Sequence, residues 1–257
     1  MGFLTEVTDE VRRGLDRSPL DGSGLIALAR GLPPARSFHD ALRGADPPAI
    51  IAEIKRSSPS AGRIADTDPA ARARAYEAAG AAAVSVLTEP MHFDGSLADL
   101  RAAHLAVEIP VLRKDFLVDP SQVIESRAGG ADAVLLIAAA LSELELKAML
   151  AAAADLGLGA LVEAHSDGDL EKALATDAAV VGVNARDLET LEVDAARALR
   201  LLGEVPADRV AVLESGLSTR QDVERALEAG AVAVLVGEAL MRAADPVAAI
   251  RALRGAA

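Results

Sequence analysis

Short apolar runs alternate with segments of helical periodicity along most of this 257-residue chain. The runs are rich in Val, Leu, Ile and Ala, and each has the length of a strand buried on both faces, as strands of a parallel sheet are. They are Ala49–Lys55, Ala82–Thr88, Pro110–Phe116, Ala133–Ala139, Gly159–His165, Val180–Ala185, Val210–Gly216 and Val232–Glu238. A regular alternation of this kind predicts one parallel sheet with helices packed against it.

The stretches between these runs predict helices. Several begin with Ser, Thr or Asp, and "SELE" (Ser142–Glu145) and "STRQ" (Ser218–Gln221) have the pattern of a capping box. The predicted helices are Asp68–Ala79, Ser96–Val107, Ser121–Ala128, Ser142–Leu156, Ser166–Ala175, Thr219–Ala229 and Pro246–Arg254. The related motifs "GAAAV" (Gly80–Val84), "GADAV" (Gly130–Val134) and "GAVAV" (Gly230–Val234) place a glycine where a helix ends and a strand begins.

Eight strand–helix units without a long linker predict an α/β fold, a closed (β/α)8 TIM barrel. A doubly wound open sheet is the alternative, but eight evenly spaced strands favour closure. We expect a single domain over residues 1–257, with a short N-terminal helical extension over 1–48 and the barrel over 49–257. The extension would supply a helix or two that cover the bottom or the rim of the barrel, ending near Ser37–Leu42.

Composition excludes several classes of function. The net charge of −13 argues against a non-specific nucleic-acid binder, because phosphate backbones are bound by basic surfaces. The chain has no cysteine, which excludes disulfides, thiolate catalysis and cysteine-ligated metals. The apolar runs are too short to span a membrane, and the acidic N-terminal segment "MGFLTEVTDEVRRGL" does not resemble a signal peptide. We therefore expect a cytoplasmic protein with neither a nucleic-acid partner nor a membrane association.

Charged and polar side chains stand at the ends of several predicted strands, where barrels of this class place their active sites. Residues two apart share one face of a strand, so the phase of each side chain can be compared between strands. The polar residues of matching phase are Glu53, Lys55, Lys114, Glu163, Asn184 and Glu214. We expect them to meet in the barrel mouth, where charges shift one another's pKa values and suit acid–base chemistry. The alternative for each residue is a solvated rim charge or a salt bridge between helices.

Two glycine turns at the ends of the last two runs predict a phosphate site. "ESGLSTRQD" (Glu214–Asp222) and "LVGEALM" (Leu235–Met241) each lead into a helical segment. In barrels these two loops often bind phosphate through backbone N–H groups, and the alternative is an ordinary tight turn. Neither a Walker A motif nor G-x-G-x-x-G follows any of the runs, so nucleotide and dinucleotide fingerprints are absent.

Loop and histidine residues complete the set of candidates. The polar loop "RSSPSAGRI" (Arg56–Ile64) predicts a mobile lid over the barrel mouth. Phe93 and Phe116 follow strands, and they either anchor their loops or stack against an aromatic substrate. The histidines have no metal-ligand spacing, and we expect them to be structural or rim residues. They are His39, His92, His104 and His165.

Together these motifs resemble the indole-3-glycerol phosphate synthase family of tryptophan biosynthesis. The resemblance covers about residues 36–254 and rests on a series of strand-end motifs. They are "AEIKRSSPSAG", "SVLTEPMHFDGS", "PVLRKDF", "LVEAH", "VGVNARDL", "ESGL" and "VGEALM". The resemblance implies a carboxy-lyase that converts 1-(2-carboxyphenylamino)-1-deoxyribulose 5-phosphate to indole-3-glycerol phosphate, carbon dioxide and water. It also implies that the reaction needs no cofactor and no metal.

The resemblance assigns roles to the charged residues. Lys114 would be the general acid that protonates the ketone oxygen, and Glu163 the base for the anilino proton. Lys55 would be the second acid and the partner of the substrate carboxylate, and either lysine is defensible at either step. Glu53 and Glu214 would keep the lysines charged and oriented. A nearby carboxylate would hold a lysine protonated, while burial would lower its pKa toward the working pH.

The same resemblance assigns residues that bind and place the substrate. Asn184 would hydrogen-bond a substrate hydroxyl and a lysine, and Ser215 would help to place the substrate. Gly216, Gly237 and Glu238 match phosphate-binding positions that act through backbone N–H groups, so the Glu238 side chain should point away from the phosphate. The remaining substrate-binding positions are Ser58 and Ser60 in the first loop, Phe93 and Phe116 in the aromatic pocket, and Arg186 and Leu188 in the sixth loop.

Two departures from the family pattern stand out. Ala185 replaces a residue that is often Asn, and we expect its side chain to face outward with little effect. Residues 1–35 match the family's N-terminal extension poorly. Because that extension helps to cover the substrate, we expect this departure to affect substrate affinity and the behaviour of the lid more than the catalysed reaction. The implied partner is a phosphorylated small molecule. Association with other tryptophan-pathway enzymes, as a monomer or a homodimer, is compatible with the resemblance.

Three other functions compete with this one. Phosphoribosylanthranilate isomerase is a related phosphosugar barrel, but its base is a cysteine and this chain has none. An aldolase could use Lys114 to form a Schiff base, which borohydride would trap. A non-catalytic barrel kept as an assembly subunit would have lost catalytic positions, and none is lost here.

Overall fold

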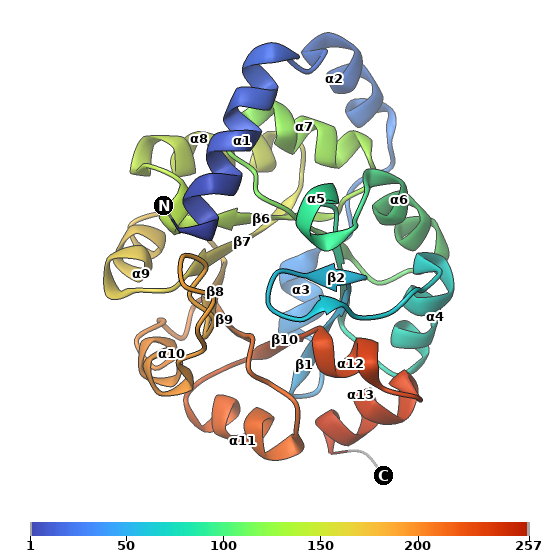
Figure 1. The fold of residues 1–257 in the computed structure, drawn as a ribbon, viewed down its shortest axis with the longest axis vertical. Helices are drawn as coiled ribbons and strands as arrows, with labels where there is room; N and C mark the ends of the chain where they lie inside the picture. Colours follow the sequence, from blue (N-terminus) through green and yellow to red (C-terminus); the bar gives the residue numbers. More distant parts are fainter. Residues whose placement is uncertain (1, 256–257) are drawn as a thin grey trace.

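A closed barrel of parallel strands forms the centre of the molecule in the computed structural model, which describes residues 2–255 (Figure 1). Within these residues eight strands close in the order β1-β10-β9-β8-β7-β6-β5-β4. They are β1 (Ala49–Ile54), β4 (Ala83–Leu87), β5 (Val111–Lys114), β6 (Ala133–Ile137), β7 (Gly159–Ala164), β8 (Val180–Asn184), β9 (Val210–Glu214) and β10 (Ala233–Val236). Every predicted strand is confirmed, and the open sheet is excluded because β1 pairs with both β4 and β10.

Helices follow the strands and form the outer layer around the barrel (Figure 1). They are α4 (Pro69–Ala78), α6 (Leu97–Ala106), α7 (Pro120–Ala128), α8 (Glu143–Asp155), α9 (Asp167–Leu174), α10 (Ala195–Leu202), α11 (Arg220–Glu228) and α13 (Pro246–Arg254), with the short α5 (Pro90–Phe93), η1 (Ala138–Ala140) and α12 (Glu238–Arg242) in the loops. All the predicted helices are present. The pattern had assigned no helix to the stretch that forms α10.

The N-termini of two helices test the predicted capping boxes. The capping box at Ser142 is confirmed, since its side chain accepts from the Glu145 N–H and that carboxylate accepts in return. The second predicted box is shifted by one residue, to Thr219 and Asp222. The shift arises because Ser218 still lies in the loop, although its own N–H also donates to Asp222.

The glycines of the repeated motif adopt the backbone conformation that the pattern predicted. Gly80, Gly130 and Gly230 have φ values of 87°, 98° and 103°, in the left-handed region that costs glycine little. Each lies between a helix and the next strand. The motif therefore sets the angle at which the chain leaves a helix to re-enter the barrel.

Side-chain alternation separates two hydrophobic clusters. Inward-facing residues such as Ile51, Leu112 and Leu161 fill the barrel interior. Their strand neighbours, for example Ile50 and Val162, belong to a larger cluster between the barrel and the helices. Both clusters consist mainly of Ala, Val and Leu, which explains how a chain with 2% aromatic residues fills two cores.

The N-terminal segment covers both ends of the barrel. Its helices are α1 (Phe3–Arg17), α2 (Gly22–Gly31) and α3 (Phe38–Arg43). Phe38 and Leu42 of α3 belong to the interior cluster and close the end at which the strands begin. The start of α1 lies at the opposite end, where the N–H groups of Phe3 and Leu4 donate to carbonyls of the loop after β8. The prediction that this segment covers the bottom or the rim is therefore confirmed for both, whereas the expected number of helices, one or two, is wrong because the segment forms three.

None of the helices within residues 2–255 combines the length and the apolar character that a membrane crossing requires. Residues 1 and 256–257 of the predicted single domain lie outside the described residues.

Candidate active site

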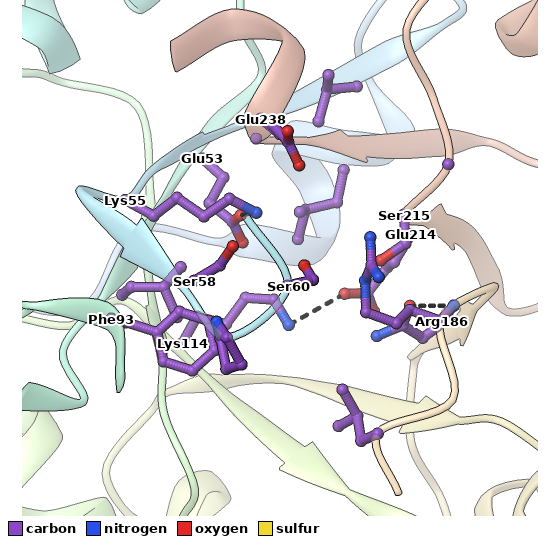
Figure 2. Close-up of a pocket in the computed structure, with 18 of the residues that line it drawn as sticks. Glu53, Lys55, Ser58, Ser60, Phe93, Lys114, Arg186, Glu214, Ser215 and Glu238 are labelled. Carbon is purple, nitrogen blue, oxygen red and sulfur yellow. Dashed lines mark hydrogen bonds and ion pairs between the residues drawn. The ribbon is translucent and has the colours of Figure 1, made fainter. Parts of the chain in front are cut away.

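A cavity of about 370 Å³ opens at the end of the barrel where the strands finish (Figure 2). Of the residues predicted for the site, Glu163 alone is not part of the lining, because it is fully buried behind Lys114. The predicted residues in the lining are Glu53, Lys55, Ser58, Ser60, Phe93, Lys114, Phe116, Asn184, Arg186, Leu188, Glu214, Ser215, Gly216, Gly237 and Glu238. Side chains from distant parts of the chain thus face one enclosed volume.

Lys114, at the end of β5, lies at the centre of a buried charge cluster. Its Nζ donates to Glu163 Oε2 of β7 at 3.1 Å and lies 3.3 Å from Glu214 Oε2 of β9. Figure 2 shows Lys114 reaching from one side of the barrel toward the carboxylate of Glu214. Both glutamate side chains are almost completely buried. Strand closure therefore builds this cluster from strands that are not neighbours in the sheet.

The pKa of Lys114 is raised well above its ordinary value. Burial works against the ammonium charge, but the negative charges of Glu163, Glu214 and Glu53 together outweigh it. The expectation that burial would lower the pKa of this lysine toward the working pH is therefore wrong. Lys114 is an ammonium group at neutral pH and has a proton to give.

The carboxyl groups of Glu163 and Glu214 have opposite pKa shifts. Burial disfavours both charges, but at Glu163 it is outweighed by Lys114 and His165, which lower the pKa of that carboxyl below its ordinary value. At Glu214 burial and the nearby charge of Glu163 raise the pKa well above the ordinary value. The two carboxyl groups are therefore pushed apart in acidity: Glu163 is the stronger acid of the pair and is ionised near neutral pH, and Glu214 is the weaker acid.

A second ion pair lies beside this cluster. Lys55, just after β1, places its Nζ 2.8 Å from Oε1 of the buried Glu53. Two glycines give the glutamates room: a Cβ at Gly237 would overlap Glu53, and a Cβ at Gly182 would overlap Glu214. The inward positions in the middle of β8 and just after β10 therefore carry no side chain, which leaves room for the two glutamates.

The loops after β8 and β9 present polar backbone to the cavity. Asn184 Oδ1 accepts from the Arg186 N–H at 2.9 Å, and within residues 2–255 Asn184 has no hydrogen bond to either Lys55 or Lys114. Ser215 and Gly216 have φ values of 65° and 72°. A left-handed conformation is strained for a serine, and strain of this kind is concentrated at functional sites.

The glycine turns lie side by side, as the phosphate prediction requires. Gly216, Gly237 and Glu238 line the same cavity. The carboxylate of Glu238 accepts from Arg242 Nε at 2.9 Å along α12.

Aromatic rings form the opposite wall. The Phe93 and Phe116 ring centroids are 6.2 Å apart, and Phe3 packs edge-on to Phe116 at 5.9 Å. Sequence reasoning missed Phe3, although the chain contains only four Phe. Its place in the lining comes from α1, whose start is held by Leu188 and Glu189 of the loop after β8.

The predicted lid is a small β-hairpin across the mouth, made of β2 (Ser57–Ser58) and β3 (Gly62–Arg63) (Figure 1). Arg56 holds its base with two hydrogen bonds to Asp99, at 2.6 and 2.8 Å. A bidentate pair of this kind fixes the orientation of the two side chains in addition to attracting them. The hairpin carries Ser58 and Ser60 into the cavity lining.

The histidines were predicted to be structural or rim residues. For His165 that prediction did not include a contact with the predicted base, Glu163. His165 is buried, and its Nε2 lies 3.2 Å from Glu163 Oε1. The phase of "LVEAH" had placed both residues on one face, which was the available signal. Among residues 2–255 no three His, Cys, Asp or Glu side chains are grouped so that they could hold a metal ion.

Comparison with known proteins agrees with this geometry. Residues 4–253 match the family model of indole-3-glycerol phosphate synthase. The indole-3-glycerol phosphate synthase of Micrococcus luteus is 48% identical and aligns with 100% of this chain and 98% of its own length; that of Rhodopirellula baltica is 46% identical over 98% and 99%. The match starts at residue 4, so the expected extent of the resemblance, about residues 36–254, is wrong at its N-terminal bound.

Solved structures share the fold at low identity. A 3-hexulose-6-phosphate synthase superimposes with a TM-score of 0.64 at 17% identity, covering 80% of this chain and 98% of its own. A thiamine phosphate pyrophosphorylase from Pyrococcus furiosus gives a TM-score of 0.61 at 15% identity, covering 85% and 96%. At these identities the likeness concerns the barrel alone.

Proposed function

The chain belongs to the indole-3-glycerol phosphate synthase family, and we propose how the charges at its barrel mouth catalyse the reaction of that family. The protein is a carboxy-lyase of tryptophan biosynthesis. It converts 1-(2-carboxyphenylamino)-1-deoxyribulose 5-phosphate to indole-3-glycerol phosphate, carbon dioxide and water. The observation that carries the proposal is a buried, protonated Lys114 held between two carboxyl groups at the edge of the cavity.

Ring closure needs an acid. The aryl carbon that bears the carboxylate attacks the ketone carbon, and Lys114 gives a proton to the ketone oxygen as the new C–C bond forms. The raised pKa of Lys114 keeps this proton in place until negative charge develops on that oxygen. Carbon dioxide then leaves, and the electron pair of the broken C–C bond restores the aromatic ring.

Dehydration needs an acid and a base together. The new hydroxyl group leaves as water with a proton from a lysine, for which Lys55 is the candidate because it lines the cavity beside Glu53. The anilino nitrogen gives its proton to Glu163, whose carboxyl pKa is lowered below its ordinary value so that the group is ionised. A proton then moves from the adjacent ring carbon to nitrogen, which completes the indole.

The remaining lining fits the two ends of the substrate. The rings of Phe3, Phe93 and Phe116 offer an apolar wall for the anthranilate ring. Gly216 and Gly237 lie in the turns that would bind the phosphate, with Ser215 beside them. Ser58, Ser60, Arg186 and Leu188 would close over the substrate, and Asn184 would bind its hydroxyl groups.

A Schiff-base aldolase is disfavoured by the same observation. An attacking amine must be unprotonated, whereas three carboxyl groups raise the pKa of Lys114. Borohydride added with a carbonyl substrate should therefore trap no adduct on Lys114.

Indole fluorescence tests the proposal directly. Purified protein mixed with the substrate should develop it between about pH 6 and 8, and Lys114→Ala or Glu163→Gln should lower kcat at least about 100-fold. Absence of signal from folded protein would contradict the activity. Near-full turnover by either variant would contradict the residue roles and leave the family unaffected.

Assembly and location follow from the resemblance alone. We keep the monomer or homodimer, the cytoplasmic location and the association with pathway enzymes as predictions. Light scattering coupled to size exclusion measures the oligomeric state directly.

A further inference from the structure

His165 and Lys114 contact different oxygens of the Glu163 carboxylate. His165 lies two residues after Glu163 on the same face at the end of β7, with a side chain that is 7% exposed. Its Nε2 is 3.2 Å from Glu163 Oε1, whereas Glu163 Oε2 accepts from Lys114 at 3.1 Å. We propose that His165 is a positioning residue, whose ring N–H holds Oε1 so that Oε2 keeps its contact with Lys114 at the edge of the cavity. The inference rests on the proposed role of Glu163 as the base.

Polar atoms of Glu163 and His165 lack well-aligned hydrogen bonds. Within residues 2–255, Glu163 Oε1 and both ring nitrogens of His165 are buried without an aligned hydrogen bond. Leaving a buried carboxylate oxygen unpaired is costly, and an N–H donor to a charged acceptor offsets that cost. At 3.2 Å a small rotation of the imidazole completes the bond.

The backbone of His165 is fixed where the side chain needs it. Its N–H points to Asp169 Oδ2 at 3.4 Å, and the same oxygen accepts from Ser166 at the start of α9. The capping box of α9 therefore ties the end of β7 to a helix terminus. The other charged groups around the pair are Lys114 on β5, Glu214 on β9 and Asp187 after β8.

The positioning role differs from a merely structural one in what it predicts for kinetics. Without His165, the carboxylate of Glu163 can rotate out of its present plane, and fewer molecules hold the base aligned. The substrate is bound by other side chains, so KM should change little while kcat falls. A structural role would instead lower stability and leave the turnover of folded molecules unchanged.

Three variants at position 165 separate these roles. His165→Leu removes the donor, His165→Gln places an amide N–H about where Nε2 is, and His165→Asn places one about where Nδ1 is. We expect His165→Leu to lower kcat about 10- to 100-fold with KM within about twofold, because it loses one hydrogen bond to a charged group. His165→Gln should recover most of the loss and His165→Asn less.

His104 provides a matched control. It also places Nδ1 near a buried carboxylate, 3.3 Å from Asp132 Oδ2, but among the helices and away from the cavity. His104→Leu should lower the thermal unfolding temperature and leave kcat within about twofold. Circular dichroism of each variant reports the folded fraction.

The outcomes are distinct. Retention of kcat by folded His165→Leu, or equal losses in the Gln and Asn variants, would overturn the inference. If His165→Leu does not fold, the comparison of Gln with Asn decides alone. A Glu163→Gln variant with full turnover would instead contradict the proposed role of Glu163 as the base, which none of the position-165 results can do.

Discussion

The two ends of the barrel use the same strands for opposite purposes. Where the strands begin, inward positions hold residues such as Ala49 and Val180, and Phe38 and Leu42 of α3 close the interior. Where they finish, the same inward phase holds Glu53, Lys114, Glu163 and Glu214. One end therefore contributes packing and the other carries buried charge that packing must support. Stability and catalysis can be altered separately along one set of strands.

The largest expected effect falls on the apolar end. Phe38→Ala removes a ring that is 1% exposed, and we expect the free energy of unfolding to fall by about 3 to 5 kcal/mol. Folded molecules should keep their kcat because the cavity lies at the far end. Urea unfolding and turnover corrected for folded fraction test both parts. A large loss of corrected kcat would break the division between the ends.

At the charged end, Gly237→Ala should lower kcat/KM about 10- to 100-fold, since a methyl group there overlaps Glu53 and displaces its pair with Lys55. The control is Gly168→Ala in α9, where a Cβ meets nothing within 4 Å. That change should leave activity unchanged and raise helix stability slightly. Steady-state kinetics and thermal unfolding distinguish them; equal activity in both variants would contradict the close packing of the mouth.

Buried charge also predicts a pH dependence of stability. The folded pKa of Glu214 is raised above its unfolded value, so this carboxyl stabilises the fold below the unfolded pKa and loses that contribution as pH rises toward the folded pKa. Glu214→Gln has no proton to lose. We expect the stability of wild type relative to Glu214→Gln to fall as the pH rises from 4 to 8. Urea unfolding across this range would refute this if the difference between the two proteins were constant or changed in the opposite direction.

The smallest effect concerns the lid. Arg56→Lys replaces a two-pronged contact with Asp99 by a single one, and KM should rise about 3- to 10-fold with little change in kcat. Arg63→Lys is the control, because its pair with Asp66 is exposed and should contribute little. Substrate titration by indole fluorescence measures both. Equal KM values would show that the clamp does not govern lid closure.

Local signals predicted most of the fold and of the site's membership. Alternation placed Glu53 and Lys55 on one face, and β1 confirms that Glu53 faces the mouth. Ala185 faces the helix layer as expected, within the outer cluster. Phe3 escaped prediction because nothing near residue 3 shows that the loop after β8 holds the start of α1.

By itself, the sequence determined the barrel, its register of inward and outward residues, and the polar groups that could reach the mouth. These follow from the two-residue period of strands and from glycines at helix ends, which are local properties of the chain. Only the tertiary structure decided that Lys114 contacts both Glu163 and Glu214, that the pKa of Lys114 rises, and that His165 lies beside Glu163. The reason is that charges interact through space, so the proton balance of the site depends on how many carboxyl groups closure brings around each lysine.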